Sequence, residues 1–320
     1  MTSILEGALE RGPFAGEGGR TDATFERAVL SDGRSVVIKH VTASSLVAQF
    51  TGEWDRAWRL WRNGVFARVP DVLDHTIITV EPDGTDWIIV MRDIGDDDLG
   101  DHRRLSRAES ARILSAVNQM HREFDSERFD GGASLDDHYA FLSRERISSS
   151  GWSLAPVLLR GWDLFFTGVG PRDVADVYER LMTAPSLLVG ELEKRPQTFI
   201  HGDVRLHNIG LSSDRVVLYD WELAGTGPGA VDVAWYLIIS ASRVDTTREQ
   251  IIEDYKRIAG DRFDPVAWDL ACIGTFGRLG WNKAIDIVDN PDESVRARER
   301  ADLDWWIGRV REALETWSPL

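Results

Sequence analysis

Residues 199–209 read FIHGDVRLHNI, and residues 216–222 read VVLYDWE. In each segment a short apolar run leads into polar residues, which is the pattern of a strand that ends at a loop. The first loop carries Asp203 and Asn208, and the second strand ends at Asp220. Oxygen ligands of this kind suit Mg²⁺, which takes one or two protein carboxylates beside phosphate oxygens and water. A carboxylate that positions a hydroxyl, together with metal ligands near phosphates, is what phosphoryl transfer requires.

Other interpretations of these residues are open. His201 and His207 with Asp203 form a metal cluster in one of them, although no further ligand follows at a helical or zinc-finger spacing. Taken alone, Asp220 is an aspartate that caps a turn after a strand. The combination of Asp203, Asn208 and Asp220 favours chemistry over either alternative.

The composition excludes several classes of protein. Of the 320 residues, 43% are apolar and 28% charged, which is typical of a globular chain and not of a disordered or fibrous one. A net charge of −16 opposes binding to nucleic acid or to anionic membranes. It agrees with a cationic small substrate, or with a solvated acidic surface. The single cysteine, Cys272, excludes an internal disulfide framework. The N-terminus lacks the pattern of a signal peptide, and we expect a cytoplasmic protein.

The order of predicted elements indicates an α+β chain. Hairpins are expected over residues 24–41 and 76–91, the second with its turn at 81–84, and one helix over 46–63. An acidic connection follows at 93–101, and the rest is mostly helical. Helices are expected behind the capping-box sequence at 106–109 and at six later places, which are 171–182, 185–192, 231–240, 248–259, 265–288 and 293–315.

The chain resembles the aminoglycoside phosphotransferase and choline kinase family, which are small-molecule relatives of the protein kinases. The signature of that family is His-Gly-Asp, four variable residues and Asn, followed by an Asp-x-Asp/Glu strand end. Residues 201–208 and 220–222 match both halves at the right spacing. The segment GPGAVDVAW at 227–235 also looks like the family, and the resemblance keeps its order from about residue 16 to residue 306.

The resemblance implies a bilobal, protein-kinase-like fold. Residues 1–92 would form a small nucleotide-binding lobe, an antiparallel sheet with one helix. Residues 93–320 would form a larger, mainly helical lobe for catalysis and acceptor binding, with a hinge at about 91–98. The implied activity is Mg²⁺-dependent transfer of the γ-phosphate of ATP, or of GTP, to a hydroxyl group of a small molecule.

The acceptor and the alternatives to a kinase stay open at this point. An aminoglycoside, an amino-sugar or another antibiotic, and a metabolic amino-alcohol or sugar, all suit the family. A nucleotide-binding pseudokinase or regulatory module is a second class, and a helical protein that binds cationic ligands is a third. The sequence agrees with a monomer or a homodimer, and with no nucleic-acid or membrane partner.

The resemblance also assigns roles within the two motifs. Asp203 would be the catalytic aspartate that accepts or orients the proton of the acceptor hydroxyl. Arg205 would neutralise charge on the transferred phosphate. Asn208 and Asp220 would bind Mg²⁺.

Two further residues of these segments are expected to support the loop. His201 would pack and form hydrogen bonds within the loop, and Asp232 would brace the loop through backbone amides. Residues 221–222 replace the Phe-Gly of protein kinases, and no Ala-Pro-Glu segment follows. Both departures argue against a protein substrate.

The nucleotide would be bound by the first ninety residues. Lys39, at the end of an apolar strand, would be the phosphate-binding lysine, whereas a lone lysine there is normally only solvated. Asp55 on the following helix is its expected acidic partner, with Glu53 as the alternative. The adenine would contact backbone groups of Met91 to Asp93.

The phosphate loop is the weakest match to the family. Gly18 and Gly19 lie where phosphates would be covered by backbone amides, but Thr21 stands where the third glycine belongs. A flexible N-terminal loop is the alternative. For the acceptor, the candidates are Glu222, Trp281 and Asp286. Tryptophan at helical spacing is also typical of a core, and the chain has 13 tryptophans.

Overall fold

The computed structural model describes residues 4–14, 24–100 and 103–320, and the chain forms two compact units. The first unit combines Met1–Ala133 with Thr198–Asp261, and the second combines Ser134–Gln197 with Arg262–Leu320. The units therefore do not follow chain order, because the segment with both motifs belongs with the N-terminal part. The predicted lobe boundary at about residues 91–98 lies inside the first unit and stays a prediction.

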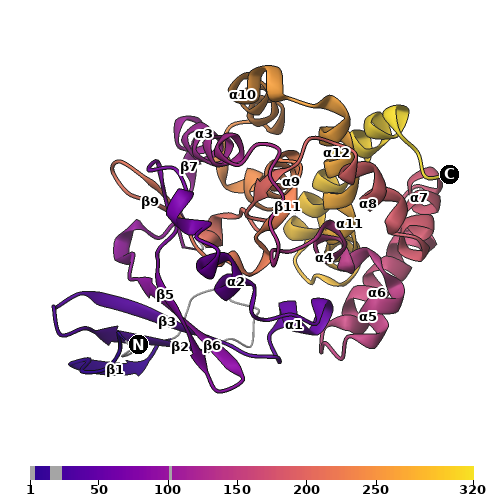
Figure 1. Cartoon of the computed structure of the whole chain (residues 1–320). Helices are drawn as coiled ribbons and strands as arrows, with labels where there is room; N and C mark the ends of the chain where they lie inside the picture. The colour runs from indigo at the N-terminus through magenta and orange to yellow at the C-terminus, as the bar shows by residue number, and fades with distance from the viewer. Residues whose placement is uncertain (1–3, 15–23, 101–102) are drawn as a thin grey trace. The chain divides into compact units, whose positions relative to one another are not determined.

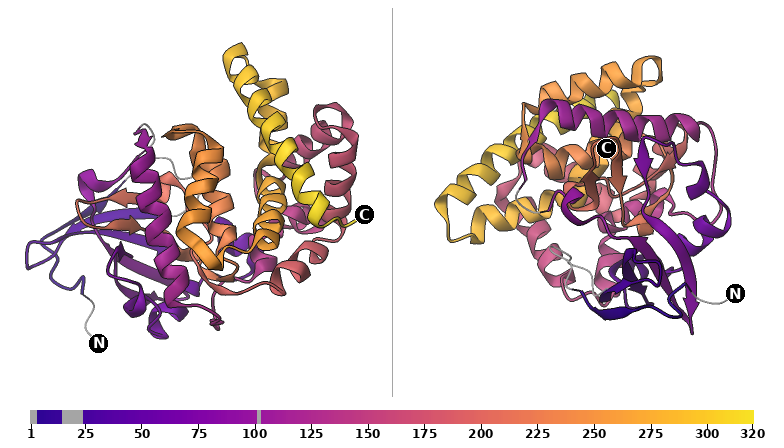
Figure 2. Two further views of the ribbon diagram at one scale, coloured as in Figure 1. Left: turned by 90° about the horizontal axis from the view of Figure 1, so that it is seen from above. Right: turned by 90° about the vertical axis from the view of Figure 1, so that its left-hand side faces the viewer.

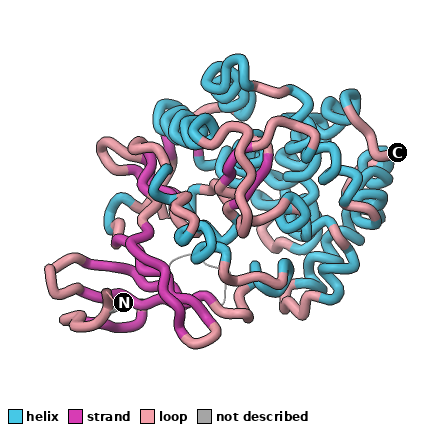
Figure 3. The backbone as a smooth tube through the Cα atoms, in the orientation of Figure 1, coloured by secondary structure: helices cyan, strands magenta, loops and turns pink. Residues whose placement is uncertain are grey.

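The first unit contains a five-stranded antiparallel sheet (Figures 1 and 3). Its strands, in spatial order, are β1 (Glu10–Pro13), β2 (Thr24–Val29), β3 (Ser35–Val41), β6 (Asp86–Arg92) and β5 (Ile77–Asp83). The turn from β2 to β3 is the predicted one, and Gly33 has the left-handed φ of 84° that favours glycine. Val36, Ile38 and Val90 form the centre of the small core under this sheet. The β-branched run at 36–38 thus predicted the buried central strand correctly.

The second hairpin differs from the prediction in its turn. Asp83 pairs with Asp86, so the turn lies at Gly84 and Thr85, two residues later than expected. Pro82 is inside the strand and lies opposite Trp87. This position suits proline because β5 is an edge strand, and the missing N–H is not needed by a further neighbour.

The predicted single helix over 46–63 is two helices, α1 (Leu46–Thr51) and α2 (Arg56–Arg62). Gly52 ends α1 with a φ of 75°, and its N–H donates to the carbonyl of Ala48. A left-handed glycine in this place is a common helix end, so the break is local in origin. The chain then starts α2 with Asp55 at its N-terminus.

The rest of the first unit places the two motifs between short sheets and helices. Three small sheets occur, β4 (Leu73–Asp74) with β10 (Val216–Leu218) and β9 (Ile209–Leu211), β8 (Thr198–Ile200) with β11 (Gly225–Gly227), and β7 (Leu105–Ser106) with β12 (Val244–Asp245). Three helices accompany them, α3 (Arg107–Glu123), α9 (Ala230–Ser240) and α10 (Arg248–Ala259). The capping box of Ser106 and Glu109 starts α3 as predicted. Figure 2 shows α3 and α10 side by side, where Arg107 forms an ion pair with Asp254 at 2.8 Å.

The second unit is helical. It comprises α4 (Leu135–His138), α5 (Arg144–Ser149), α6 (Ala155–Leu164), α7 (Arg172–Thr183), α8 (Ser186–Glu193), α11 (Pro265–Asp289) and α12 (Glu293–Thr316). Gly161 lets α6 approach α11 closely, because a Cβ there would lie 2.4 Å from the carbonyl oxygen of Trp281. The predicted α+β class is confirmed. None of the helices in the described ranges is both long and apolar enough to span a membrane.

Candidate active site

A pocket of about 570 Å³ lies in the first unit, which is a volume typical of small-molecule sites. Apolar side chains from the five-stranded sheet and the segment after it form part of its lining, namely Phe14, Phe25, Val37, Met91 and Ile94. Polar and charged residues from both motifs and from β3 also line it, including Lys39, Arg205, Asn208 and Asp220. The pocket therefore joins an apolar wall to a charged one, as the binding of a purine nucleotide requires.

Lys39 is buried, with 3% of its surface exposed, and it pairs with two carboxylates. Its Nζ donates to Oδ1 of Asp220 at 2.8 Å and also to Oε2 of Glu222. Burial by itself would lower the pKa of Lys39, but the two negative charges outweigh burial and raise it. The lysine is therefore charged at neutral pH and fixed at the pocket wall.

Asp220 holds an unusual backbone conformation at the end of β10. Its φ is 68°, in the left-handed region that a non-glycine residue seldom occupies, and such strain is often found at functional sites. Burial raises the pKa of its carboxyl, whereas the charge and hydrogen bond of Lys39 lower it by more, so the net direction is downward. For Glu222, burial and repulsion from Asp220 prevail and raise the pKa. Of the two carboxyls, Asp220 is the one whose pKa is lowered.

Asp203 is surrounded by hydrogen-bond donors on both of its oxygens. Nδ2 of Asn208 donates to Oδ2 at 2.8 Å, and Nε of Arg205 lies 3.2 Å from the same oxygen. The indole N–H of Trp235 donates to Oδ1 at 2.6 Å. Such contacts fix the orientation of the carboxylate and stabilise its negative charge. Sequence reasoning named three of these four residues and gave Trp235 no role.

Asp232 and His201 support the loop as expected. The carboxylate of Asp232 accepts hydrogen bonds from the backbone N–H groups of His201 at 2.9 Å and Gly202 at 2.7 Å. It also accepts one from the imidazole of His121 at 2.9 Å. Burial raises the pKa of Asp232, but the hydrogen bond and charge of His121 lower it overall. The bracing through backbone amides is confirmed.

His201 uses both ring nitrogens inside the loop. Its Nδ1 accepts from the N–H of Asp203 at 3.2 Å, so its Nε2 donates to the carbonyl of Tyr219 at 3.1 Å. Burial lowers its pKa, which keeps the ring neutral. The expected packing and hydrogen bonding of His201 are confirmed. The alternative of a metal cluster with His207 is wrong, because in the described part of the chain no three His, Cys, Asp or Glu side chains form a metal site.

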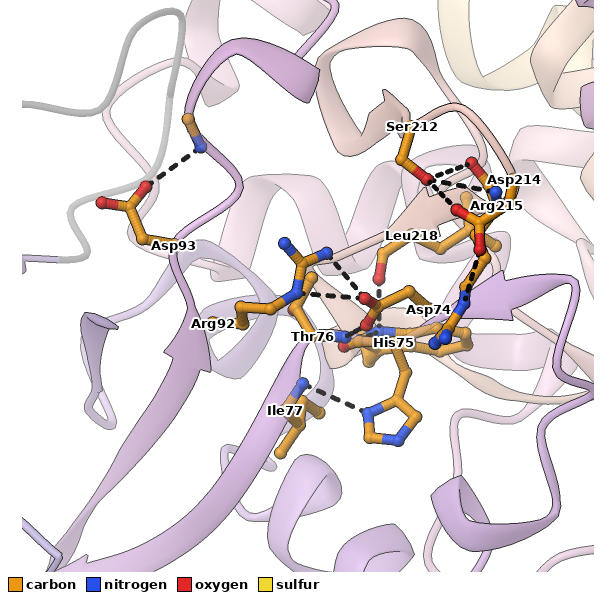
Figure 4. Close-up of polar contacts among 12 residues, drawn as sticks. Asp74, His75, Thr76, Ile77, Arg92, Asp93, Ser212, Asp214, Arg215 and Leu218 are labelled. Carbon is orange, nitrogen blue, oxygen red and sulfur yellow. Dashed lines mark hydrogen bonds and ion pairs between the residues drawn. The ribbon is translucent and has the colours of Figure 1, made fainter. Parts of the chain in front are cut away.

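The predicted adenine contacts lie at the pocket, and their side chains are shown in part by Figure 4. Met91 is on β6 and buried, and Asp93 follows the strand. The carboxylate of Asp93 accepts from the N–H of Gly95 at 3.1 Å (Figure 4). It also accepts from Ser35 Oγ at 2.8 Å and pairs with Arg27. The side chain of Asp93 thus ties the end of β6 to β2 and β3.

Behind this segment, Arg92 is held by Asp74. The guanidinium donates to Oδ2 of Asp74 at 2.6 Å, and Oδ1 of the same carboxylate accepts from the N–H of Thr76 at 2.8 Å (Figure 4). Arg92 and Thr76 both line the pocket. Asp74 therefore fixes the cationic side chain of Arg92 beside the predicted adenine position.

Asp55 does not pair with Lys39, as the sequence predicted, but with an arginine of its own helix. Its carboxylate pairs with Arg59 at 2.8 Å, one turn later on α2, and Glu53 also pairs with Arg59. Because α1 ends at Gly52 and α2 begins only at residue 56, both acids lie just before α2 and pair with an arginine on it. Among the described residues the ion pairs of Lys39 go to Asp220 and Glu222, so the predicted pairing with Asp55 is corrected to Glu222.

Four predicted site residues remain, and two of them can be placed. Gly18 and Gly19 lie outside the described residues. Trp281 and Asp286 are both on α11 in the second unit. The indole N–H of Trp281 donates to the carbonyl of Arg278, and Asp286 accepts from Asn282 at 2.7 Å. Burial, followed by the charge of Glu299, raises the pKa of Asp286. Their role toward an acceptor stays a prediction.

The donor set of the pocket fits magnesium. The amide nitrogen of Asn208 is committed to Asp203, so the amide oxygen is the atom left for a cation. Asp220, the carboxyl of the pair with the lowered pKa, lines the same pocket. One carboxylate and one amide oxygen are a suitable protein contribution to Mg²⁺, which takes its other ligands from phosphates and water.

The sequence profile of the phosphotransferase enzyme family matches residues 16–271. No curated protein sequence matches the chain.

Several solved structures share its fold. The crystal structure of choline kinase LicA from Streptococcus pneumoniae is 13% identical, with a TM-score of 0.54, and the match covers 97% of this chain and 94% of that one. The microcompartment-associated aminopropanol kinase is 12% identical, with a TM-score of 0.54 and coverages of 98% and 96%. LicA in complex with AMP is 14% identical, with a TM-score of 0.50 and coverages of 96% and 92%. The predicted protein-kinase-like fold is thereby confirmed.

Proposed function

The chain belongs to the phosphotransferase enzyme family and is a small-molecule kinase, and we propose that it transfers the γ-phosphoryl group of MgATP to a hydroxyl group of a small molecule. The observation that carries this proposal is the convergence of Lys39, Asn208 and Asp220 on one pocket, with Asp203 hydrogen-bonded to Asn208. Each of these residue types supplies one requirement of phosphoryl transfer: charge beside the phosphates, ligands for a divalent cation, and a carboxylate that orients the attacking group.

The proposed reaction is a direct displacement. The oxygen of the acceptor hydroxyl forms a bond to the γ-phosphorus, and the bond from that phosphorus to the bridging oxygen of ADP breaks. The hydroxyl proton passes to the carboxylate of Asp203. Arg205, which lines the same pocket, would interact with the transferred group. No covalent phosphoenzyme is needed.

Other residues of the same pocket would bind the nucleotide and the metal. Lys39 would bind phosphate oxygens, and the apolar wall with Phe25 and Val37 would contact the purine. Asn208 and Asp220 would hold Mg²⁺, which when bound neutralises negative charge on the phosphates. Glu222 would keep Lys39 oriented when Asp220 turns to the cation. This assignment replaces the acceptor role that sequence analysis gave to Glu222.

The acceptor is proposed only as a hydroxyl compound. The net charge of −16 favours a cationic one, which includes aminoglycosides, amino-sugars and amino-alcohols. Trp281 and Asp286 stay candidates for its recognition. A pseudokinase is disfavoured because Lys39 and the ionisable residues of both motifs are all present.

The direct test is release of nucleoside diphosphate from MgATP or MgGTP with a panel of acceptors. The panel should contain aminoglycosides, macrolide and peptide antibiotics, amino-sugars, neutral sugars and amino-alcohols. We expect acceptor-stimulated release with one of these classes and a loss of about 10³-fold or more in Asp203→Asn, since the base is removed at nearly constant shape.

The matched control is Asp214→Asn. Asp214 is an exposed aspartate of the same unit and does not line the pocket (Figure 4). Its substitution should leave the rate unchanged. Equal release by wild type and Asp203→Asn would overturn the role of Asp203, and absence of any MgATP or MgGTP binding would overturn the proposed function.

A further inference from the structure

The side chain of Trp235 contacts the centre of the proposed chemistry. Trp235 is on α9 and only 7% exposed. Its Nε1 donates to Oδ1 of Asp203 at 2.6 Å, a short distance for a hydrogen bond to a carboxylate. The other carboxylate oxygen, Oδ2, is occupied by Asn208 and Arg205. The indole is thus the donor that fixes the second oxygen.

The helix that carries Trp235 also carries Asp232. The two residues are three positions apart, so they lie about one turn apart on the same face of α9. Asp232 holds the backbone N–H groups of His201 and Gly202, and Trp235 holds the side chain of Asp203. One buried helix therefore fixes both the path of the loop and the rotation of the carboxylate.

The pattern of donors also distinguishes the two oxygens of Asp203. Oδ2 accepts a hydrogen bond from Asn208 and also forms an ion pair with Arg205, whereas Oδ1 accepts the indole hydrogen bond and has no cation beside it among the described residues. A carboxylate oxygen has two acceptor positions. Within the described part of the chain, Oδ1 is therefore the less engaged oxygen and the one suited to an acceptor hydroxyl.

We propose that Trp235 is a positioning residue for phosphoryl transfer, which holds Oδ1 of Asp203 toward the acceptor hydroxyl. This inference rests on the proposed function of Asp203. Trp235 touches neither nucleotide nor acceptor in this proposal, and it acts only through Asp203. Its removal therefore changes the rate of transfer and not the binding of substrates.

The first test is a kinetic comparison of Trp235→Phe with wild type, using the acceptor class identified by the panel. Phenylalanine retains an aromatic ring and removes the N–H. We expect kcat to fall about 10- to 100-fold, as is usual when a donor to a charged catalytic group is lost, with KM for MgATP and for the acceptor changed less than twofold. Trp306→Phe is the control, because Trp306 is fully buried in the second unit and is not one of the residues that line the pocket.

The second test does not need an acceptor. In protein labelled with ¹⁵N at the indole nitrogen, the Trp235 resonance is assigned by its absence in Trp235→Phe. A short hydrogen bond to a carboxylate predicts a downfield indole proton that exchanges slowly with water. In Asp203→Asn we expect this resonance to move upfield and exchange faster, while the resonance of Trp306 stays in place.

The outcomes separate the two proposals. A wild-type enzyme that binds nucleotide but transfers phosphate to no acceptor contradicts the proposed function, not this contact. Normal kcat in a folded Trp235→Phe, an equal rise in KM, or an indole resonance insensitive to Asp203→Asn would each overturn the positioning role.

Discussion

Lys39 and Lys283 are both buried, and each pairs with two carboxylates, yet their surroundings differ. Lys39 is on β3, and its partners Asp220 and Glu222 are about 180 residues later in the chain. Lys283 is on α11 in the second unit. Its partners Glu299 and Asp302 lie on the next helix, α12.

The two groups differ in where they lie and in the backbone that carries them. The Lys39 group lines a pocket, and one of its carboxylates sits on a left-handed backbone. The Lys283 group joins two regular helices that follow each other, and Lys283 does not line that pocket. Burial and pairing of a lysine alone therefore do not indicate function. The proposed function of the Lys39 group rests instead on the pocket that it lines, on partners far away in the chain, and on the left-handed backbone of Asp220.

The largest expected difference between the two lysines is in nucleotide binding. Lys39→Met should weaken binding of MgATP about 100-fold or more, because a phosphate-binding charge is lost from a pocket of low dielectric. Lys283→Met should change it less than twofold. Isothermal titration with MgADP and with a non-hydrolysable ATP analogue measures both. Similar losses in the two variants would remove the distinction.

The loss of folding stability should have the opposite order, with a larger loss in Lys283→Met than in Lys39→Met. Removing one partner of a buried ion pair costs about 3–5 kcal/mol, so we expect a loss of that size for Lys283→Met. Lys39→Met should cost less, because Glu222 already has a raised pKa and takes up a proton when the lysine is absent.

Urea-unfolding curves of both variants test this order. Lys194→Met serves as the control, since Lys194 forms an exposed pair with Glu191 and its loss should cost less than about 1 kcal/mol. A larger destabilisation in Lys39→Met than in Lys283→Met would contradict the structural reading of the second group.

A third prediction concerns which acid serves Lys39. Glu222→Gln should weaken binding of MgADP about tenfold, because the lysine loses the partner that does not bind the cation. Asp55→Asn should weaken it less than twofold, since Asp55 pairs with Arg59. If Asp55→Asn has the larger effect, α2 moves toward Lys39 when nucleotide binds, and the geometry described for the free protein does not persist.

The smallest predicted effect belongs to Asp286, close to the Lys283 group. Its pKa is raised in the folded protein, so it adds stability below its ordinary value of 3.8 and loses this contribution as the pH rises through the raised value. Asp286→Asn should therefore unfold at a slightly higher urea concentration than wild type at pH 7, by about 0.5 kcal/mol or less for a partly exposed group. At pH 4 the difference should be smaller. A difference that grows toward pH 4 has the wrong sign.

Local sequence signals predicted the fold well where they were complete. The first hairpin lies within the predicted residues 24–41, and the helix predicted over 171–182 is α7 to within one residue at each end. The single helix predicted over 46–63 is wrong because Gly52 ends α1 in a left-handed conformation. The turn predicted at residues 81–84 is wrong because Pro82 lies inside an edge strand. The local sequence does not show that a proline belongs to such a strand.

The site was predictable in its loop and less so in its distant contacts. Asp203, Asn208 and Asp220 share one motif spacing, and the loop support by Asp232 also followed from the family. The pairing of Lys39 with Glu222 depends on how β3 and β10 come together, which spacing along the chain does not contain. The contact of Trp235 was within reach, because it lies one helical turn after Asp232.

The division into two units has a consequence for how substitutions alter the choice of acceptor. Every described residue assigned here to nucleotide, metal and phosphoryl transfer belongs to the first unit, from Lys39 to Trp235. Residues 134–197 and 262–320 contain none of them, yet they hold the candidates for acceptor recognition. A library of substitutions in those two segments that spares buried pairs such as Lys283 would leave the residues proposed for phosphoryl transfer unchanged. We expect such a library to alter the choice of acceptor more than the transfer step.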